Sequence, residues 1–473
     1  MKQGKLFLIF LLLNACSVGP DYVRPTVATP SQFKEAPPGW KVATPQNCDD
    51  SAWWEVFKDQ ELNQLMNKLN VQNETIKGAI AQYYQACALI AQAQAAYFPT
   101  ATAAVSVTPQ KQSSLSSPNT NVASTSTLFV RAPYTDHNVT LEATWAPDLW
   151  GSVRRSVEAS VAGAQASKDE IAAVRLLSQA SLAQYYFQLR GLDNNQSVLD
   201  KTVKTYKKIL EITLNQYKVG TASRAQILQI QSLLEQAEVL ALDNGILRAQ
   251  YEHAIAVLMG EPPANFSVVP RSYTATMPII PTQLPSSLLE RRPDIAQAER
   301  LVAQANAEIG VAISAYFPVL TLTGMDGWDS INLAKWFTAP AHFWSLGSQL
   351  LETVFDGGLR GAKVAQARAV YDQTVAQYRQ TVLSAFQNVE DNLAGWRILE
   401  KEHSKQNEAV KTAQHSLKIV INEYNAGTAQ LSDILNSEIT LYGVEQNAYT
   451  IAYRQSVAVV SLIQALGGGW KND

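Results

Sequence analysis

The chain has 473 residues, of which 47% are hydrophobic and 17% are charged, and its formal net charge is −3. This balance argues against a nucleic-acid-binding protein, which needs a basic face, and against a disordered chain, which lacks the apolar surface found here. The only long apolar run lies at the N-terminus, so no internal helix is predicted to span a bilayer. A membrane role would have to come from strands or from a lipid.

The N-terminus, residues 1–15, is predicted to be a signal peptide, because lysines precede a short apolar core. Residues 13–16 read Leu-Asn-Ala-Cys, which resembles a bacterial lipoprotein cleavage box, so Cys16 is predicted to become the first residue and to carry the lipid. Ser17 after it resembles a signal for sorting to the outer membrane. The alternative is an ordinary secretory signal with an incidental cysteine. Residues 16–61 are predicted to be a lipidated tether and N-terminal segment.

A helical pattern over residues 62–97 stops at Ala96-Tyr97-Phe98-Pro99, where proline cannot continue the hydrogen-bond ladder. The same stop recurs as Ala315-Tyr316-Phe317-Pro318, 219 residues later. This recurrence indicates an internal duplication.

After each stop the apolar period changes from helical to two, which predicts strands at about 99–147 and about 319–355. Ala101, Ala103, Val105 and Val107, for example, alternate with polar residues. Strands that are apolar outside and polar inside suit a membrane barrel. The alternative is a soluble sheet with one buried face. Because four strands cannot close a barrel in lipid, the barrel would be shared among copies of the chain.

Two very long helices are predicted after the strands. Residues 152–216 contain no proline, and a second such stretch begins after the glycines at 357 and 358. In the second stretch, a heptad repeat indicates coiled-coil packing; its residues are Val375, Val382, Val389 and Trp396. An intramolecular bundle with solvated faces is the alternative. Return helices are predicted over 222–259 and 429–466.

The turns between the long and return helices are the clearest repeat. Residues 215–228 read NQYKVGTASRAQIL and residues 422–435 read NEYNAGTAQLSDIL, 207 residues apart. We call these the first and second tips. A glycine in each is predicted to end one helix before the next begins. The repeats are therefore placed at 62–260 and 292–473, with a linker at 261–291.

No catalytic motif is found in the sequence. The five histidines are not at metal-ligand spacing, and there is no nucleophile elbow, phosphate-binding glycine loop or Cys-x-x-Cys motif. An enzyme is not predicted. For Cys48 and Cys87, separate thiols are favoured, although an oxidising periplasm would permit a disulfide.

Taken together, these motifs resemble the TolC/OprM-type outer-membrane factor family, in its lipidated NodT-type subgroup. The resemblance rests on the duplicated stops and tips and on two further segments, Cys16-Ser-Val-Gly-Pro-Asp-Tyr-Val-Arg-Pro and Leu289-Glu-Arg-Arg-Pro-Asp-Ile. It implies a mixed α and β fold: a long-helix α-barrel plus four strands per chain in a shared trimeric transmembrane β-barrel of twelve strands.

The resemblance also implies a function. The chain would be a passive exit duct of tripartite efflux for small molecules such as drugs, metals or other toxic compounds, in the outer membrane. Its partners would be a periplasmic adaptor and an inner-membrane pump of the resistance-nodulation-division type, with no cofactor beyond the lipid on Cys16. The alternatives are an exit duct for type I protein secretion and a periplasmic coiled-coil lipoprotein scaffold without a pore.

Site residues follow from the resemblance by position. Tyr424 and Asp433 would form the constriction at the periplasmic entrance, and the hairpin tips would contact the adaptor through Gly220, Thr221, Gly427 and Thr428. Gln226 occupies the position of Asp433 in the first tip. Since three Asp433 carboxylates would repel one another in a trimer, the alternative role for Asp433 is compensation of the helix N-terminal charge.

Overall fold

The computed structural model describes residues 17–35, 52–111, 133–273 and 291–468. Cys16, Cys48 and the predicted signal peptide lie outside these residues. The chain forms two compact units. The first comprises Met1–Arg24, Gln85–Ala164 and Leu301–Thr374, and the second comprises Pro25–Tyr84, Gln165–Arg300 and Val375–Asp473.

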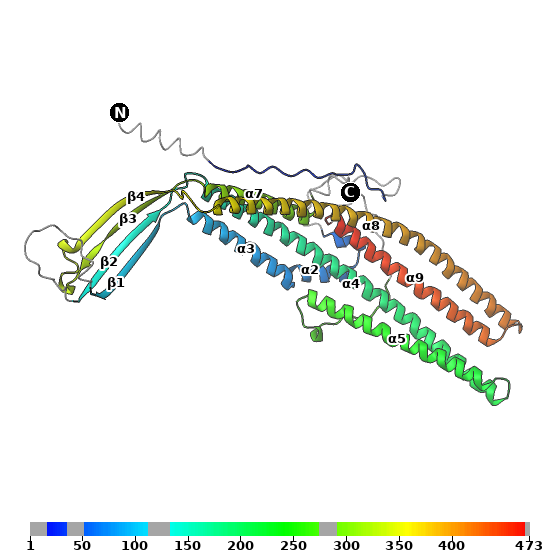
Figure 1. Cartoon of the computed structure of the whole chain (residues 1–473). Helices are drawn as coiled ribbons and strands as arrows, with labels where there is room; N and C mark the ends of the chain where they lie inside the picture. The colour runs from blue at the N-terminus through cyan, green and yellow to red at the C-terminus, as the bar shows by residue number, and fades with distance from the viewer. Residues whose placement is uncertain (1–16, 36–51, 112–132, 274–290, 469–473) are drawn as a thin grey trace, which may run out of the picture. The chain divides into compact units, whose positions relative to one another are not determined.

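Both halves of the sequence contain one helix, then two strands, then two helices, in the same order (Figure 1). The principal elements are α2 Gln60–Gln72, α3 Glu74–Ala95, β1 Thr100–Gln110, β2 Tyr134–Trp145, α4 Ser152–Lys218, α5 Arg224–Leu258, α7 Pro293–Ser314, β3 Val319–Ser330, β4 His342–Leu351, α8 Leu359–Asn425 and α9 Leu431–Ala465. Short 3-10 turns occur at Trp53–Phe57, Pro263–Asn265, Leu333–Lys335 and Ala339–Ala341.

The element lengths confirm the predicted duplication. Helices α3 and α7 each have 22 residues, α4 and α8 each have 67, and α5 and α9 each have 35. Each half therefore contains a helix, a strand pair, a long helix and a return helix.

The strands lie in the first unit and form one antiparallel sheet of four strands in the order β1-β2-β3-β4. The prediction of four strands is confirmed. Strand β4 ends at Leu351 and not at the predicted limit of about 355, because Arg360 holds the next residues in a turn: it donates to Glu352 at 3.1 Å and to Asp356 at 2.7 Å. The hydrogen bond from Arg360 also holds the pKa of Asp356 below its usual value.

Two tryptophans fix the Tyr-Phe-Pro stops in the first unit. The indole N–H of Trp145 donates to the carbonyl of Tyr97 at 3.0 Å, and that of Trp150 donates to the carbonyl of Pro318 at 2.7 Å. Trp150 also stacks on Phe317, with ring centroids 5.0 Å apart. These bonds hold the backbone between the end of each helix and the start of the following strand, α3 to β1 and α7 to β3.

In the second unit, the predicted helix over 62–97 is wrong in one respect, because it is interrupted at Asn73. This residue has a ψ of 122°, which is not helical. Its side-chain oxygen accepts the backbone N–H of Ile76 at 2.9 Å, and its amide donates to the carbonyl of Leu258 at 2.9 Å. Asn73 therefore caps α3 and ties it to the end of α5.

The heptad prediction for α8 is confirmed at three positions and wrong at the fourth. Val375, Val382 and Val389 are buried, but Trp396 is only half-buried. Leu393 is fully buried next to it. A straight helix drifts by about 20° per heptad from a strict seven-residue repeat, which moves the buried stripe off Trp396.

A buried network of charged residues lies in the second unit around Arg190 of α4. The Arg190 side chain has no exposed surface. Arg190 donates to Asp193 at 2.8 Å and to Glu61 at 2.5 Å. Asp193 also accepts from Arg248 of α5 at 2.8 Å. Because buried charges are tolerated only when paired, this network fastens the start of α2 and helices α4 and α5 to one another.

Candidate functional site

The two tips have the same backbone turn. In the first tip, Gly220 donates to the carbonyl of Tyr217 at 3.0 Å and Thr221 donates to that of Gln216 at 2.9 Å. In the second tip, the equivalent bonds from Gly427 and Thr428 are also 3.0 and 2.9 Å long. This is the Schellman pattern, and it needs a residue with positive φ. Both glycines have φ of 78°.

The threonines reinforce both turns. The hydroxyl of Thr221 donates to the carbonyl of Gln216 at 3.0 Å, and that of Thr428 donates to the carbonyl of Glu423 at 3.0 Å. Each threonine thus gives two hydrogen bonds to one helix-end carbonyl. The Gly-Thr pair is explained locally by this turn.

The return helices begin with equivalent caps. The side-chain oxygen of Gln226 accepts the backbone N–H of Ser223 at 2.7 Å, and the carboxylate of Asp433 accepts that of Gln430 at 2.8 Å. Ser223 completes the reciprocal bond by accepting the N–H of Gln226 at 3.2 Å. Asp433 therefore caps the start of α9 through this hydrogen bond.

The tip surfaces are exposed and differ in charge. Tyr217 and Tyr424 keep 47% and 42% of their surfaces exposed. Residues 215–228 contain Lys218 and Arg224 and no acid, a charge of +2, whereas residues 422–435 contain Glu423 and Asp433 and no base, a charge of −2. One backbone motif thus presents two surfaces of opposite sign. Figure 1 shows both turns at the same end of the second unit.

The segment after the predicted lipidation site is docked onto the first unit. Val18 donates to the carbonyl of Trp150 at 3.1 Å. Arg155, buried in α4, donates to the carbonyl of Val18 at 3.2 Å and to Asp21 at 2.8 Å. Gly19 has φ of 97°, and a Cβ there would lie 2.5 Å from the Cα of Gly310.

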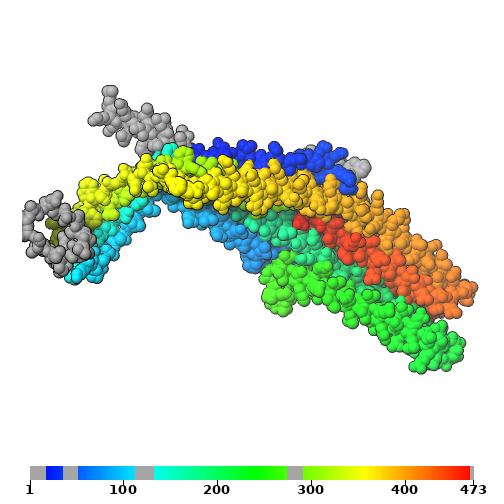
Figure 2. Space-filling model, in the orientation of Figure 1, coloured from blue at the N-terminus to red at the C-terminus, as the bar shows by residue number. Residues whose placement is uncertain are grey.

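The prediction of a tether is therefore incomplete, because the N-terminal segment is extended but is held to the helices by hydrogen bonds. Figure 2 shows it in dark blue on the surface of the helices. In the second unit, the backbone N–H groups of Lys34 and Glu35 donate to the Glu390 carboxylate at 2.8 and 2.9 Å. No periodicity in residues 17–35 signals these contacts, since most of them use backbone groups.

The sheet has one apolar and one polar face. Residues directly opposite one another on paired strands share a face, so the register collects the apolar positions on one side. That side holds Ala101, Ala103, Val105, Val107, Val139, Leu141, Ala143, Trp145, Leu320, Leu322, Trp344, Leu346 and Leu350. The other side is mainly polar and holds Thr102, Ser106, Thr108, Asn138, Thr140, Glu142, Thr144, Thr321, Thr323, Ser345 and Gln349, together with the apolar Ala104, Val319, Met325, Phe343 and Leu351.

The apolar face is not covered by the described chain. Val105, Leu141 and Leu346 keep 69%, 55% and 80% of their surfaces exposed. One carboxylate interrupts the face, Asp326, which lies 2.9 Å from Nε2 of His342. The outer edges of the sheet, β1 and β4, each pair with a single neighbouring strand.

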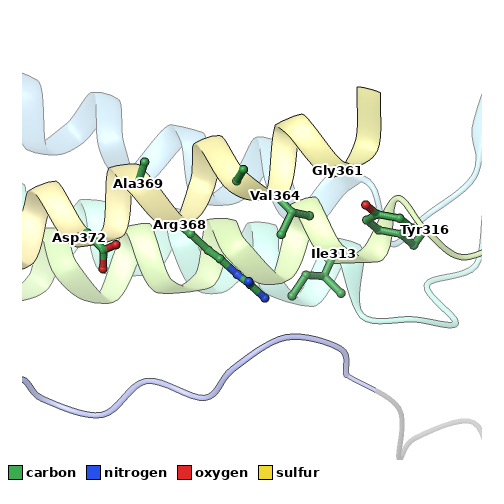
Figure 3. Close-up of a pocket in the computed structure, with 8 residues that line it drawn as sticks. Ile313, Tyr316, Gly361, Val364, Arg368, Ala369 and Asp372 are labelled. Atoms are coloured by element: carbon green, nitrogen blue, oxygen red, sulfur yellow. The ribbon is translucent and has the colours of Figure 1, made fainter. Parts of the chain in front are cut away.

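A groove of about 710 Å³ runs between α7 and α8 in the first unit (Figure 3). Ile313 of α7 and Tyr316 of the turn after it line the groove from one side, and Val364, Arg368 and Asp372 of α8 line it from the other. Figure 3 shows the Arg368 side chain reaching from α8 toward α7. The lining mixes apolar and charged groups and contains no nucleophile paired with a base.

Membrane-spanning helices and metal-ligand clusters are both absent from the described residues. No helix among them is long and apolar enough to cross a bilayer. Within the same residues, no group of three or more His, Cys, Asp and Glu side chains could hold a metal ion.

Comparison with known proteins gives a consistent result. The family model described as "Outer membrane efflux protein" matches residues 65–261 and 284–468. The pyoverdine export outer membrane protein OpmQ of Pseudomonas aeruginosa is 28% identical over 478 residues, covering 100% of this chain and 98% of that protein. The cation efflux system protein CusC of Escherichia coli O6:H1 is 26% identical over 471 residues, covering 98% of each. The solved outer-membrane channel OprN is 25% identical, with a TM-score of 0.84 over 96% of this chain and 100% of that one.

Proposed function

This chain belongs to the outer membrane efflux protein family, and from that membership we propose that it is the exit duct of a tripartite efflux system in the outer membrane. The observation that carries the proposal is the four-stranded sheet, which has one exposed apolar face, one polar face and two open edges. In lipid, such a face meets the hydrocarbon and the polar face lines a water-filled pore.

The open edges support a barrel shared by several copies, and we propose that the number of copies is three. Unpaired backbone groups in hydrocarbon cost several kcal/mol each, so strands in a membrane must close into a barrel. Edge β1 of one copy can pair with edge β4 of the next. Three copies of a four-stranded sheet give a closed barrel of about twelve strands, within the known range.

The tips are proposed to meet the periplasmic adaptor and to narrow the entrance. Gly220, Thr221, Gly427 and Thr428 form the rigid turns that the adaptor would contact. Tyr424 and Asp433 would lie at the constriction. In a trimer the +2 and −2 tips would alternate around the entrance, an arrangement that favours contacts between neighbouring tips.

The lipid is proposed to be attached at Cys16. Its neighbours Ser17 and Val18 are held at the turn that joins β2 to α4: a Cβ on Gly151 would lie 2.9 Å from the Cα of Ser17. The anchor would thus join the protein where β2 ends and α4 begins. A single acyl chain binds membranes only marginally, so the strands and the lipid would act together.

The cargo is proposed to be small molecules delivered by an inner-membrane pump of the resistance-nodulation-division type. OpmQ is named for pyoverdine export and CusC for cation efflux, although each is similar to this chain over nearly its whole length. We infer from these two names that the cargo is selected by the pump and the adaptor.

Planar-bilayer recording of the purified, lipidated protein tests the proposal. We expect channels of defined conductance and a detergent-corrected molar mass of three processed, lipidated chains. A monomer that inserts without conductance would overturn the duct and support the scaffold alternative.

A further inference from the structure

A polar pocket of about 510 Å³ lies in the second unit, apart from the tips and from the sheet. It is lined by the 3-10 turn that begins at Trp53, by α2 and α4, by the start of α7 and by the residues after α9. Its polar side chains are arginines and amides: Arg175, Arg291, Asn67, Asn70 and Gln179. No aspartate or glutamate is among the described residues that line it. The lining is therefore positively charged.

Arg175 of α4 gives the pocket its clearest unmet charge. Within the part of the chain that the structure describes, its guanidinium forms no ion pair and no hydrogen bond. The side chain is partly buried and its Nε atom is fully buried, so Nη1 and Nη2 are the atoms that a ligand could reach. A partly buried charge without a counter-ion is unfavourable. A bound anion would supply the missing partner.

A chain of hydrogen bonds orients a second donor in the same pocket. The indole N–H of the buried Trp53 donates to the side-chain oxygen of Gln179 at 3.1 Å, and the Gln179 amide donates to the side-chain oxygen of Asn70 at 2.7 Å. Because that oxygen already accepts a bond, the Asn70 amide nitrogen remains as a donor. A guanidinium and an oriented amide together suit the oxygens of a carboxylate or a phosphate.

The second repeat has apolar residues at the equivalent positions. The offset of 207 residues that aligns the tips also aligns α4 with α8, and it places Val382 and Phe386 opposite Arg175 and Gln179. Both apolar side chains are buried. A helix of the same length in the same fold thus packs with apolar residues at these positions. Helix packing alone does not explain the arginine in the first repeat.

We propose that this pocket binds a small oxyanion, a carboxylate or a phosphate, which accepts hydrogen bonds from the terminal nitrogens of Arg175 and from the amide of Asn70. The pocket is open to solvent at Asn67, which is exposed, so a ligand can enter without a change in the fold. The proposal goes beyond conduction, since the site lies within one chain and does not depend on an open pore.

Isothermal titration calorimetry of the purified full-length protein in detergent tests the proposal, in a buffer free of phosphate and carboxylate. Inorganic phosphate and citrate are titrated separately, because the first offers phosphate oxygens and the second offers carboxylates. We expect saturable binding of at least one of these ions, with one ion bound per chain. The ion that binds more tightly identifies the class of ligand. If neither ion binds, the proposal is overturned.

Variants locate the site. Arg175→Gln should weaken binding by about tenfold or more, the effect of one hydrogen bond to a charged group. Arg379→Gln is the matched control, because it removes an exposed arginine from α8 and should leave the affinity unchanged. Asn70→Asp keeps an acceptor for Gln179 but places a negative charge in the pocket, so it should also weaken binding, and it serves if Arg175→Gln does not fold. Wild-type affinity in either folded pocket variant would overturn the proposal.

Discussion

Gln226 and Asp433 occupy the same position in the two tips and form the same bond, each accepting a backbone N–H three residues earlier, at 2.7 and 2.8 Å. The two side chains differ in charge but not in capping geometry. This pair therefore allows the capping role of Asp433 to be separated from any electrostatic role at the entrance.

Asp433→Asn and Asp433→Ala are expected to differ in the stability of the second tip if the carboxylate only caps α9. Asparagine keeps an acceptor and alanine does not, so only alanine should destabilise the tip, by about 1 kcal/mol. If the charge also holds the entrance shut, both variants should raise the open fraction in bilayer recordings.

Gln226→Ala is the matched control, because it removes the equivalent cap from the first tip without changing its charge. It should loosen the first tip as Asp433→Ala loosens the second. Unchanged conductance in both Asp433 variants would leave the aspartate only its capping role.

Gly427→Ala is expected to lower the thermal stability of the protein. At φ of 78° an alanine is strained by about 1–2 kcal/mol, even though no atom lies within 4 Å of the added Cβ. Gly443→Ala is the control: this glycine lies inside α9, also in open space, and alanine should stabilise the helix by about 0.5–1 kcal/mol. Thermal unfolding in detergent measures both changes. If the two variants shifted the unfolding temperature in the same direction, the requirement for glycine at position 427 would be contradicted.

Local patterns were sufficient to predict the elements of the fold. The glycines, the Tyr-Phe-Pro stops and the period-two segments each act within a few residues, and the strands and long helices lie where these signals place them. The break at Asn73 was missed although Asn-Glu is a recognisable helix start. The apolar pattern continues through it, and the partner of Asn73 is the carbonyl of Leu258, 185 residues away.

The candidate sites were predicted less completely. The tips were found because they are repeated. The docked N-terminal segment was not, since Val18 and Gly19 bond through their backbones to residues more than 100 positions away.

Gly19→Ala is expected to release the docked N-terminal segment. A Cβ at this position would lie 2.5 Å from the Cα of Gly310, and both the backbone approach and the positive φ resist it. Amide hydrogen exchange should become at least tenfold faster at Val18, whose N–H is bonded to Trp150. Gly78→Ala, at a position in open space, should leave the exchange of Val18 unchanged; equal protection in both variants would contradict the docking.

Leu141→Arg is expected to reduce the amount of protein assembled in the outer membrane, whereas Thr140→Arg is expected to leave it unchanged. Leu141 lies on the apolar face and its neighbour Thr140 on the polar face. Arginine facing lipid near the bilayer centre costs about 2–4 kcal/mol, whereas a pore-facing arginine is tolerated. The amount of assembled protein in outer-membrane fractions measures the difference. Equal yields would argue against the assignment of the two faces.

Tyr186→Phe is expected to make the protein less sensitive to alkali. Burial raises the pKa of Tyr186, and the charge and hydrogen bond of Asp59 add to the effect, while Arg190 opposes it. The unfolded chain loses this proton near pH 10, but the folded chain retains it, so stability must fall as the pH rises above about 10. One such proton changes the unfolding free energy by about 1.4 kcal/mol per pH unit.

Tyr186→Phe removes this proton, so the loss of stability above pH ~10 should become shallower by that amount. At neutral pH the variant should be less stable by about 1–2 kcal/mol, because Asp59 loses the 2.7 Å bond from the Tyr186 hydroxyl and Arg271 loses its 2.8 Å acceptor. Unfolding measured between about pH 8 and pH 11 tests both effects.

Tyr273→Phe should also make the loss of stability at alkaline pH shallower, because burial raises the pKa of Tyr273 too. An alkaline slope identical to that of the wild type in Tyr186→Phe would show that this hydroxyl is not held in its protonated form by the fold.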